Sequence, residues 1–176
     1  MKNNFLFFLI IISFSCSKLE PRRPVNPKPS TMFYFEAMQQ NKILNKKEDD
    51  KIMQLIKNDS TKTYFQSSSG FWYTYLNKIE DDLQLPKTGN EVIFEYNITS
   101  LNDAIIYTKE ELGIKNYIVD KEDFISGIQK GIKLMKIGET ITFVIPSYSA
   151  FGIAGDNNKI GVNQSIKSTV TLINIK

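Results

Sequence analysis

One segment in the second half of the chain constrains the fold more than any other. Residues 124–152 read FISGIQKGIKLMKIGETITFVIPSYSAFG. At its start Phe124, Ile128 and Ile132 recur every four residues, so they share one face of a predicted short helix. Two glycines, also four residues apart, lie on a neighbouring face. Because glycine weakens a helix, this pair predicts that another element approaches the helix backbone closely.

A predicted strand follows the helix within the same segment. Lys136, Ile137 and Gly138 give a turn signal, and polar and apolar residues then alternate over Glu139–Ile145. Pro146 ends the strand, since proline has no N–H to donate to a sheet ladder. The residues that follow form a loop that ends on an aromatic side chain and a glycine.

Further short strands are predicted in the chain after residue 60. They are Thr63–Gln66, Phe71–Leu76, Glu91–Thr99, Ala104–Thr108, Tyr117–Val119 and Ile166–Ile175. Asn102 and Asp103 give a hairpin signal. The fold class is therefore α+β, an antiparallel sheet covered by one short helix, with an apolar cleft between them as the default binding site. In the polar loop Gly152–Asn163, we interpret Asp156–Asn158 as turn chemistry rather than as calcium ligands.

The combination of elements in residues 124–152 resembles the FKBP-type peptidyl-prolyl isomerases. Family members carry an apolar pair, a short helix with two glycines, a Met-x-x-Gly turn, a strand ending in Ile-Pro, and an Ala-aromatic-Gly loop. The matching residues here are Phe124-Ile125, Gly127 and Gly131, Met135 and Gly138, Ile145-Pro146, and Ala150-Phe151-Gly152. The resemblance covers Ser69–Ile175. It implies a curved antiparallel sheet wrapped over one short helix, and it implies cis–trans isomerisation of the peptide bond before proline.

The same resemblance implies the residues of the site. Tyr96 matches the family's pocket tyrosine, and Ile125 matches the isoleucine whose backbone N–H meets the ligand carbonyl. Phe151 matches the tyrosine of the Ala-Tyr-Gly loop, and these three are the expected catalytic residues. The residues expected to bind substrate are Ile106, Tyr107, Phe124, Ile128 and Ile166.

Several positions depart from the family pattern. Ile128 stands where the family has a pocket-floor tryptophan, and Ile106-Tyr107 stands where it has a phenylalanine–aspartate pair. Ser168 replaces an inward phenylalanine, and Phe151 keeps the family ring but lacks its hydroxyl. These departures predict an apolar pocket that is shallower or differently shaped.

Composition excludes other catalytic chemistries. The 176-residue sequence has no histidine and one cysteine, which removes histidine-dependent nucleophiles, histidine metal sites and a CxxC redox motif. We expect no metal and no cofactor, and the formal charge of +3 is too small to indicate a nucleic-acid partner. Prolyl isomerisation needs none of these groups, because it only twists an amide. A dry pocket and a backbone N–H directed at the carbonyl can favour the twisted state.

The N-terminus has the pattern of a targeting segment. Its apolar run, Phe5–Ile12, is shorter than the roughly 17–25 residues of a spanning helix, so residues 1–15 are interpreted as a signal peptide. Ser13–Cys16 resembles a lipobox, which predicts lipidation of Cys16 and attachment to a membrane. Ordinary secretion with a free thiol and an uncleaved anchor are the alternatives. Residues 16–30 contain four prolines and are typical of an extended tether.

Residues 31–60 form a predicted helical arm. The helix is expected over Thr31–Lys57, with a charged and solvated middle at Asn45–Lys51. Its apolar positions are Phe33, Ala37, Met38, Leu44, Ile52, Leu55 and Ile56. This face is too thin to fold alone. The helix is therefore expected either to brace the FKBP-like domain, residues 61–176, or to act as a homodimer arm.

The predicted function is prolyl isomerisation that assists the folding of proline-containing clients in the cell envelope. A non-catalytic FKBP-fold chaperone or scaffold is the main alternative, and a structural lipoprotein that bridges envelope proteins through its helix is a third. Within the family, the sequence looks most like the gliding-motility-associated FKBP-like lipoproteins of gliding Bacteroidetes. That resemblance implies a link to gliding or secretion machinery. It also implies a lipid-anchored location on the periplasmic side of the outer membrane.

Overall fold

The computed structural model describes residues 30–81 and 84–176. The predicted signal peptide, the lipidation site Cys16 and the tether up to residue 29 lie outside the described residues. The chain divides into two compact units, Met1–Met38 and Gln39–Lys176. Of the first unit, the structure describes only the start of helix α2, Ser30–Asn58.

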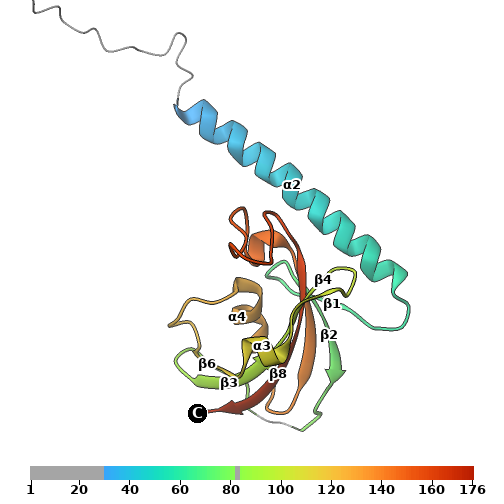
Figure 1. Ribbon diagram of the computed structural model, residues 1–176, viewed down its shortest axis with the longest axis vertical. Helices are drawn as coiled ribbons and strands as arrows, with labels where there is room; N and C mark the ends of the chain where they lie inside the picture. The colour runs from blue at the N-terminus through green and yellow to red at the C-terminus, as the bar shows by residue number, and fades with distance from the viewer. Residues whose placement is uncertain (1–29, 82–83) are drawn as a thin grey trace, which may run out of the picture. The chain divides into compact units, whose positions relative to one another are not determined.

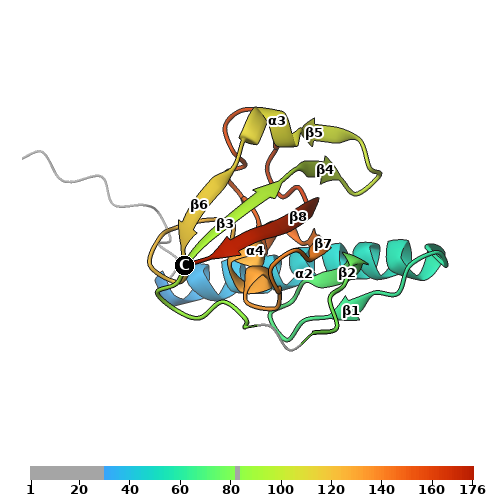
Figure 2. The ribbon, with the colours of Figure 1, turned by 90° about the horizontal axis from the view of Figure 1, so that it is seen from below.

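An antiparallel sheet of eight strands dominates the second unit (Figures 1 and 2). The strands are β1 Phe65–Gln66, β2 Trp72–Asn77, β3 Glu91–Tyr96, β4 Ile98–Ser100, β5 Ile105–Tyr107, β6 Lys115–Ile118, β7 Thr140–Ile145 and β8 Ile166–Ile175. Their order is β1-β2-β7-β8-β3-β6, and β4 pairs with both β5 and β8. The shorter helical elements are α3 Lys109–Leu112, α4 Ser126–Ile132 and the 3-10 turn η2 Ser147–Ser149. The predicted α+β class is confirmed.

The strand β8 joins the two sides of this sheet. It pairs along one edge with β7 and along the other edge with β3 and then β4. At Asn97, between β3 and β4, the side-chain Oδ1 accepts the N–H of Thr169 at 2.9 Å. The backbone N–H of Asn97 donates to the carbonyl of Thr169 at 3.2 Å. Because the Asn97 side chain takes part in the hydrogen-bond ladder with β8, the regular backbone pairing is interrupted there. The prediction of a single strand over Glu91–Thr99 is therefore wrong, and two strands, β3 and β4, replace it.

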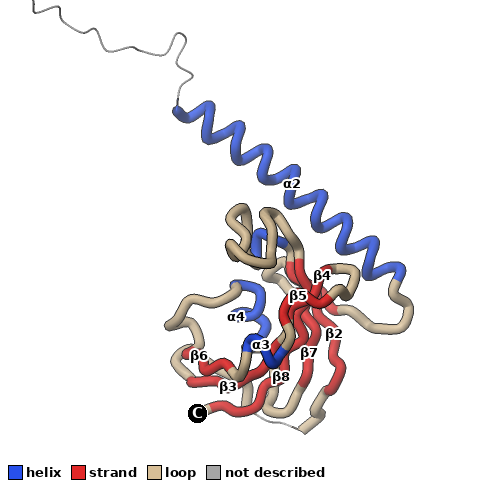
Figure 3. Tube along the Cα trace, viewed as in Figure 1, coloured by secondary structure: helices blue, strands red, loops and turns tan. Residues whose placement is uncertain are grey.

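Helix α4 lies beside the sheet (Figure 3). Its two glycines let it pack closely against β7. A Cβ on Gly127 would lie 2.6 Å from Cγ2 of Ile145, and one on Gly131 would lie 2.5 Å from Cε1 of Phe143. Carbon atoms in proteins pack at about 3.5–4.0 Å, so any side chain here would push the helix away from the strand. The close approach predicted from the glycine pair is confirmed, and it fixes the start of α4 against the sheet.

The main core lies between α4 and the sheet. Ile128 and Ile132 of α4 are fully buried there together with Met135. The fully buried side chains that the sheet contributes are Val92, Phe94, Ile141, Phe143, Ile145, Ile166, Val170 and Leu172. Burial of each such side chain stabilises the fold by roughly 1.5–3 kcal/mol before entropic costs. This core holds α4 in place and therefore positions the residues at its N-terminus.

Helix α2 contains neither glycine nor proline, which favours one continuous helix. Near its C-terminal end Ile52 is fully buried in a second cluster with Trp72, Leu101 and Val144. The expected brace between this helix and the sheet is therefore confirmed for the part of α2 that belongs to the second unit. Within the ranges described here, no helix is long and apolar enough to cross a bilayer.

The rest of the apolar face expected on α2 is not buried. Leu55 and Ile56 pack against the second cluster, whereas Phe33, Met38 and Leu44 are exposed. Ala37 is exposed as well. The thin periodicity of the sequence marked these positions as one face, but only the last turns of the helix meet apolar side chains of the sheet.

The charged middle of α2 was expected to be solvated, and this is wrong at two positions. The carboxylate of Glu48 accepts hydrogen bonds from Ser147, and that of Asp49 accepts one from the Tyr148 hydroxyl. The partners lie 99 residues away in sequence, so local charge gave no sign of them.

Helix α3 is a second short helix that the sequence analysis did not predict. Thr108 caps it: its Oγ1 accepts the N–H of Glu111 at 3.2 Å, and Glu111 Oε2 accepts the N–H of Thr108 at 2.8 Å. This is a capping box, which satisfies two N–H groups at the helix start. The other predicted elements are present with bounds that differ by one or two residues, and β8 begins and ends where it was predicted.

Candidate active site

Four residues expected at the site come from three separate places in the chain. Tyr96 is the last residue of β3, Ile125 is the N-cap of α4, Ile128 lies in the first turn of α4, and Phe151 follows η2. Tyr96, Ile125 and Ile128 belong to the same buried apolar cluster, and Phe151 packs against it. The fold therefore brings these four side chains together.

Aromatic rings form one wall of the site. The Phe124 ring centroid lies 5.4 Å from that of Tyr96, 5.7 Å from that of Phe94 and 6.0 Å from that of Tyr117. The first two pairs are edge-to-face, an arrangement that contributes roughly 0.5–1.5 kcal/mol beyond area burial. Phe124 is half-buried, so part of its ring remains accessible.

The exposed fractions of the side chains show which parts of the site solvent can reach. Ile128 and Ile166 have no exposed surface, so they form its floor and do not contact solvent. Tyr96 and Ile125 belong to the same cluster and are each 8% exposed. The residues that form the half-buried rim are Ile106, Tyr107, Phe124, Ala150 and Phe151. The accessible part of the site is thus apolar, and the substrate contacts expected of Ile128 and Ile166 stay predictions.

Two hydrogen-bond donors at the site have no partner among the described residues. They are the hydroxyl of Tyr96 and the backbone N–H of Ile125. The Tyr96 hydroxyl is not fully enclosed, since the described residues contain no enclosed side-chain polar atom without a partner. Burial raises the pKa of Tyr96 above its usual value, so the hydroxyl keeps its proton at neutral pH. Both donors are available to a ligand carbonyl.

The hydroxyl of Tyr107 is already engaged within the protein. It donates to Oδ2 of Asp156 and accepts from Nδ2 of Asn158 at 3.0 Å. The amine of Lys159 lies 4.7 Å from the centroid of the Tyr107 ring. Tyr107 therefore presents its ring rather than its hydroxyl at the rim.

Asp156 organises the loop between η2 and β8. Its Oδ1 accepts the N–H of Asn158 at 2.9 Å and the N–H of Ile160 at 2.8 Å. Burial alone would raise the pKa of Asp156, but the hydrogen bonds from Tyr107 and these N–H groups outweigh it and lower the pKa. Both carboxylate oxygens are thus used within the fold, which confirms turn chemistry for this run.

One residue of the site was missed at the level of sequence. Ile160 is 3% exposed and joins the same apolar cluster as Tyr96 and Ile125. In the sequence it is one of a few apolar residues, with Ile153 and Val162, inside a loop rich in glycine and asparagine. The Asp156 turn carries it inward.

The arrangement suits recognition of an apolar ring with an adjacent carbonyl. It offers aromatic and aliphatic surface with two free donors, and residues 30–81 and 84–176 contain no cluster of acidic, cysteine or histidine side chains suited to a metal ion. The groups present can bind an apolar ring, desolvate it and donate a hydrogen bond to a carbonyl.

Comparison with solved structures defines the class of fold. The crystal structure of FkpA from Escherichia coli matches with a TM-score of 0.59 and 21% identity, covering 100% of this chain and 83% of that chain. The peptidyl-prolyl cis-trans isomerase from Pseudomonas syringae pv. tomato matches with a TM-score of 0.59 and 19% identity, covering 77% of this chain and 95% of that one. At such identities the likeness establishes the fold.

Comparison with sequence families then identifies the chain. The family model described as FKBP-type peptidyl-prolyl cis-trans isomerase matches residues 83–173. The chain belongs to this family and is a peptidyl-prolyl isomerase. Among curated proteins, none matches the chain.

Proposed function

We propose that the surface around Tyr96, Ile125 and Phe151 binds a proline ring of a protein client and accelerates rotation about the preceding peptide bond. The observation that carries this proposal is the pair of free donors, the Tyr96 hydroxyl and the Ile125 N–H, at an apolar surface. Phe124 and Phe151 would contact the pyrrolidine ring, while Ile106 and Tyr107 would contact flanking residues of the client.

The geometry supports a mechanism without covalent chemistry. The barrier of about 18–20 kcal/mol arises because twisting removes amide resonance. An apolar surface favours the twisted amide, since water stabilises the planar and more dipolar form. A donor at the carbonyl oxygen that binds the twisted state better than the planar one lowers the barrier further, and each 1.36 kcal/mol of such preference gives about tenfold in rate. The Ile125 N–H has the fixed position that this role requires, because α4 is held by its glycines against β7.

A pair of substitutions tests the assignment. Tyr96→Phe removes only the hydroxyl, so kcat/KM for a prolyl peptide in a protease-coupled assay should fall about threefold to tenfold while stability is unchanged. Phe151→Ala should lower kcat/KM at least as much, through lost contact with the ring. The matched control is Tyr75→Phe, which removes a hydroxyl from a half-buried tyrosine on β2 and should leave kcat/KM unchanged.

The chaperone alternative is decided by the same measurements. The closed floor at Ile128 and the missing hydroxyl at Phe151 are the features that favour weak catalysis. If the wild-type chain shows no turnover but binds unfolded polypeptide, and Phe151→Ala weakens that binding, the surface is a client-binding site without catalysis. A bridging lipoprotein would instead lose its function on changes in α2 and keep it after both site substitutions.

We further propose that the chain acts in the cell envelope, lipidated at Cys16 on the periplasmic side of the outer membrane. The support is the apolar run and lipobox-like pattern of residues 1–16. Labelling of cells with a fatty acid should mark the wild type and not Cys16→Ser. The subfamily resemblance supports a role in gliding or secretion machinery, which predicts that deletion of the gene in a gliding host abolishes surface spreading and that wild-type protein restores it.

We also propose homodimerisation through the start of α2. Met32, Phe33, Tyr34, Phe35 and Met38 are each more than half exposed there. Such a cluster of exposed apolar side chains is typical of an interaction surface. Sedimentation at increasing concentration should show a dimer for the wild type and a monomer for Phe33→Ser/Phe35→Ser, and a monomeric wild type would exclude the dimer.

A further inference from the structure

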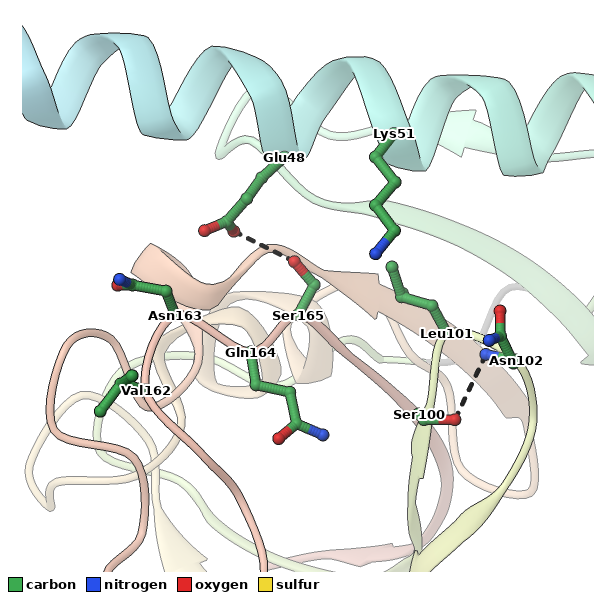
Figure 4. Close-up of a pocket in the computed structure, with 9 residues that line it drawn as sticks. All are labelled: Glu48, Lys51, Ser100, Leu101, Asn102, Val162, Asn163, Gln164 and Ser165. Carbon is green, nitrogen blue, oxygen red and sulfur yellow. Dashed lines mark hydrogen bonds between the residues drawn. The ribbon is translucent and has the colours of Figure 1, made fainter.

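A carboxylate on α2 holds the loop that follows β7. Glu48 Oε2 accepts the backbone N–H of Ser147 at 2.7 Å, and Oε1 accepts the Ser147 hydroxyl at 2.6 Å. Glu48 Oε2 also accepts the Ser165 hydroxyl at 3.0 Å, just before β8 (Figure 4). Hydrogen bonds to an ionised carboxylate are roughly twice as strong as those between neutral groups. One side chain of α2 thus links the ends of two sheet strands.

The neighbouring carboxylate adds a second contact to the same loop. Asp49 Oδ1 accepts the hydroxyl of Tyr148 at 2.9 Å, and that hydroxyl also lies 3.4 Å from the carbonyl of Gly70. Burial, together with the hydrogen bond to Asp49, raises the pKa of Tyr148. The hydroxyl therefore stays protonated and able to donate at neutral pH.

Ser147 is the residue on which the conformation of this loop depends. Its carbonyl accepts the N–H of Ala150 at 2.9 Å and the N–H of Gly152 at 2.8 Å. These two bonds close the turn that carries Phe151. Ser147 is 2% exposed, and Glu48 takes both its N–H and its hydroxyl. A shift of Ser147 would therefore move Phe151.

Two cavities lie next to the link. Glu48, Lys51 and Ser165 line a cavity of about 410 Å³, in which Figure 4 shows Glu48 and Lys51 pointing away from α2. Ser147 and Tyr148 line a second one of about 150 Å³, together with Leu44 of α2. The hydrogen bonds of Glu48 and Asp49 connect this part of α2 to the loop.

We propose that Glu48, supported by Asp49, is a positioning residue for the isomerase site: it holds the Ser147–Phe151 loop in the conformation that presents Phe151 to substrate. The inference rests on the proposed function and adds to it a role for α2. Displacement of a site residue by about 1 Å can lower activity up to a hundredfold, so loss of this link should be visible in catalysis.

The test uses the full chain and three variants. Glu48→Ala removes the link, and Glu48→Gln keeps a neutral acceptor for the Ser147 N–H and should be intermediate. Asp50→Ala is the matched control, because Asp50 is an exposed carboxylate in the same turn of α2 with no partner among the described residues. Glu48→Ala should raise amide exchange at Ala150 and Gly152 about tenfold and lower kcat/KM about tenfold, while Asp50→Ala changes neither.

Repeating Glu48→Ala in a Phe151→Ala chain separates a positioning role from an effect on general stability. If Glu48 acts through Phe151, Glu48→Ala should have little further effect on kcat/KM in a Phe151→Ala chain. Equal fold losses in both backgrounds, or unchanged exchange at Ala150 and Gly152 in Glu48→Ala, would overturn the proposal. A wild type without isomerase activity would instead reject the proposed function, and the exchange measurement would still decide whether Glu48 holds the loop.

Discussion

The close approach of α4 to β7 makes a quantitative prediction for Gly131→Ala. The new Cβ would lie 2.5 Å from Cε1 and 2.7 Å from Cζ of Phe143. Normal carbon contacts need about 3.5–4.0 Å, so helix and ring must separate by about 1 Å. Overpacking of this kind costs about 1–3 kcal/mol, and the better helix propensity of alanine returns about 0.5–1 kcal/mol. We expect a net loss of about 1–2 kcal/mol.

Urea denaturation measures this loss, and a rescue variant tests its cause. In Gly131→Ala/Phe143→Leu the smaller side chain makes room for the methyl group. The double variant should therefore be more stable than the sum of the single losses predicts, by at least about 0.5 kcal/mol. Gly161→Ala is the control glycine: its Cβ would meet only Oε1 of Gln164, at 3.5 Å, and the change should be neutral or stabilising by about 0.4–1 kcal/mol.

The reasoning is refuted by either of two results. A Gly131→Ala chain at least as stable as the wild type would mean that α4 does not lie this close to β7. Strict additivity of Gly131→Ala and Phe143→Leu would mean that the loss has another origin than contact with the Phe143 ring.

Three further predictions concern other parts of the domain. The pKa of Asp156 is lowered in the fold, so its carboxylate should make the wild type more stable than Asp156→Asn above the ordinary pKa of 3.8. This difference in stability should be lost as the pH falls below 3.8, and thermal unfolding between about pH 7 and 2 will measure it. Thr108→Ala removes the capping box with Glu111 and should cost about 1 kcal/mol in urea denaturation. Because the pKa of Tyr96 is raised above 10.0 and the sequence has no histidine, kcat/KM should be constant from about pH 6 to 9, and a titration in that range would contradict the assigned site.

The sequence predicted the elements whose local signals agree with their packing. Helix α4 and strand β7 carry the right periods, the glycine pair marks the contact between them, and a proline marks the end of the strand. Capping signals were equally available for α3, since Thr108 and Glu111 stand three residues apart. The sequence therefore carries a local signal for that helix as well.

What the sequence could not show depends on partners far away in the chain. Apolar alternation runs through Phe94, Tyr96 and Ile98 without interruption, so the break at Asn97 is visible only through its bonds to Thr169 on β8. Glu48 sits in a charged run typical of a solvated helix face, and only the fold brings it to Ser147. Distant hydrogen bonds of this kind leave no periodic trace.

The place of β8 in the sheet has a consequence for how the protein reaches its native state. This strand follows the other seven strands in sequence, yet it lies between β7 on one side and β3 and β4 on the other. Until residues 166–175 are available, β3 and β7 have no partner at their inner edges, and such open edges can pair with other chains. A nascent chain is therefore unable to complete this sheet until residues 166–175 have emerged.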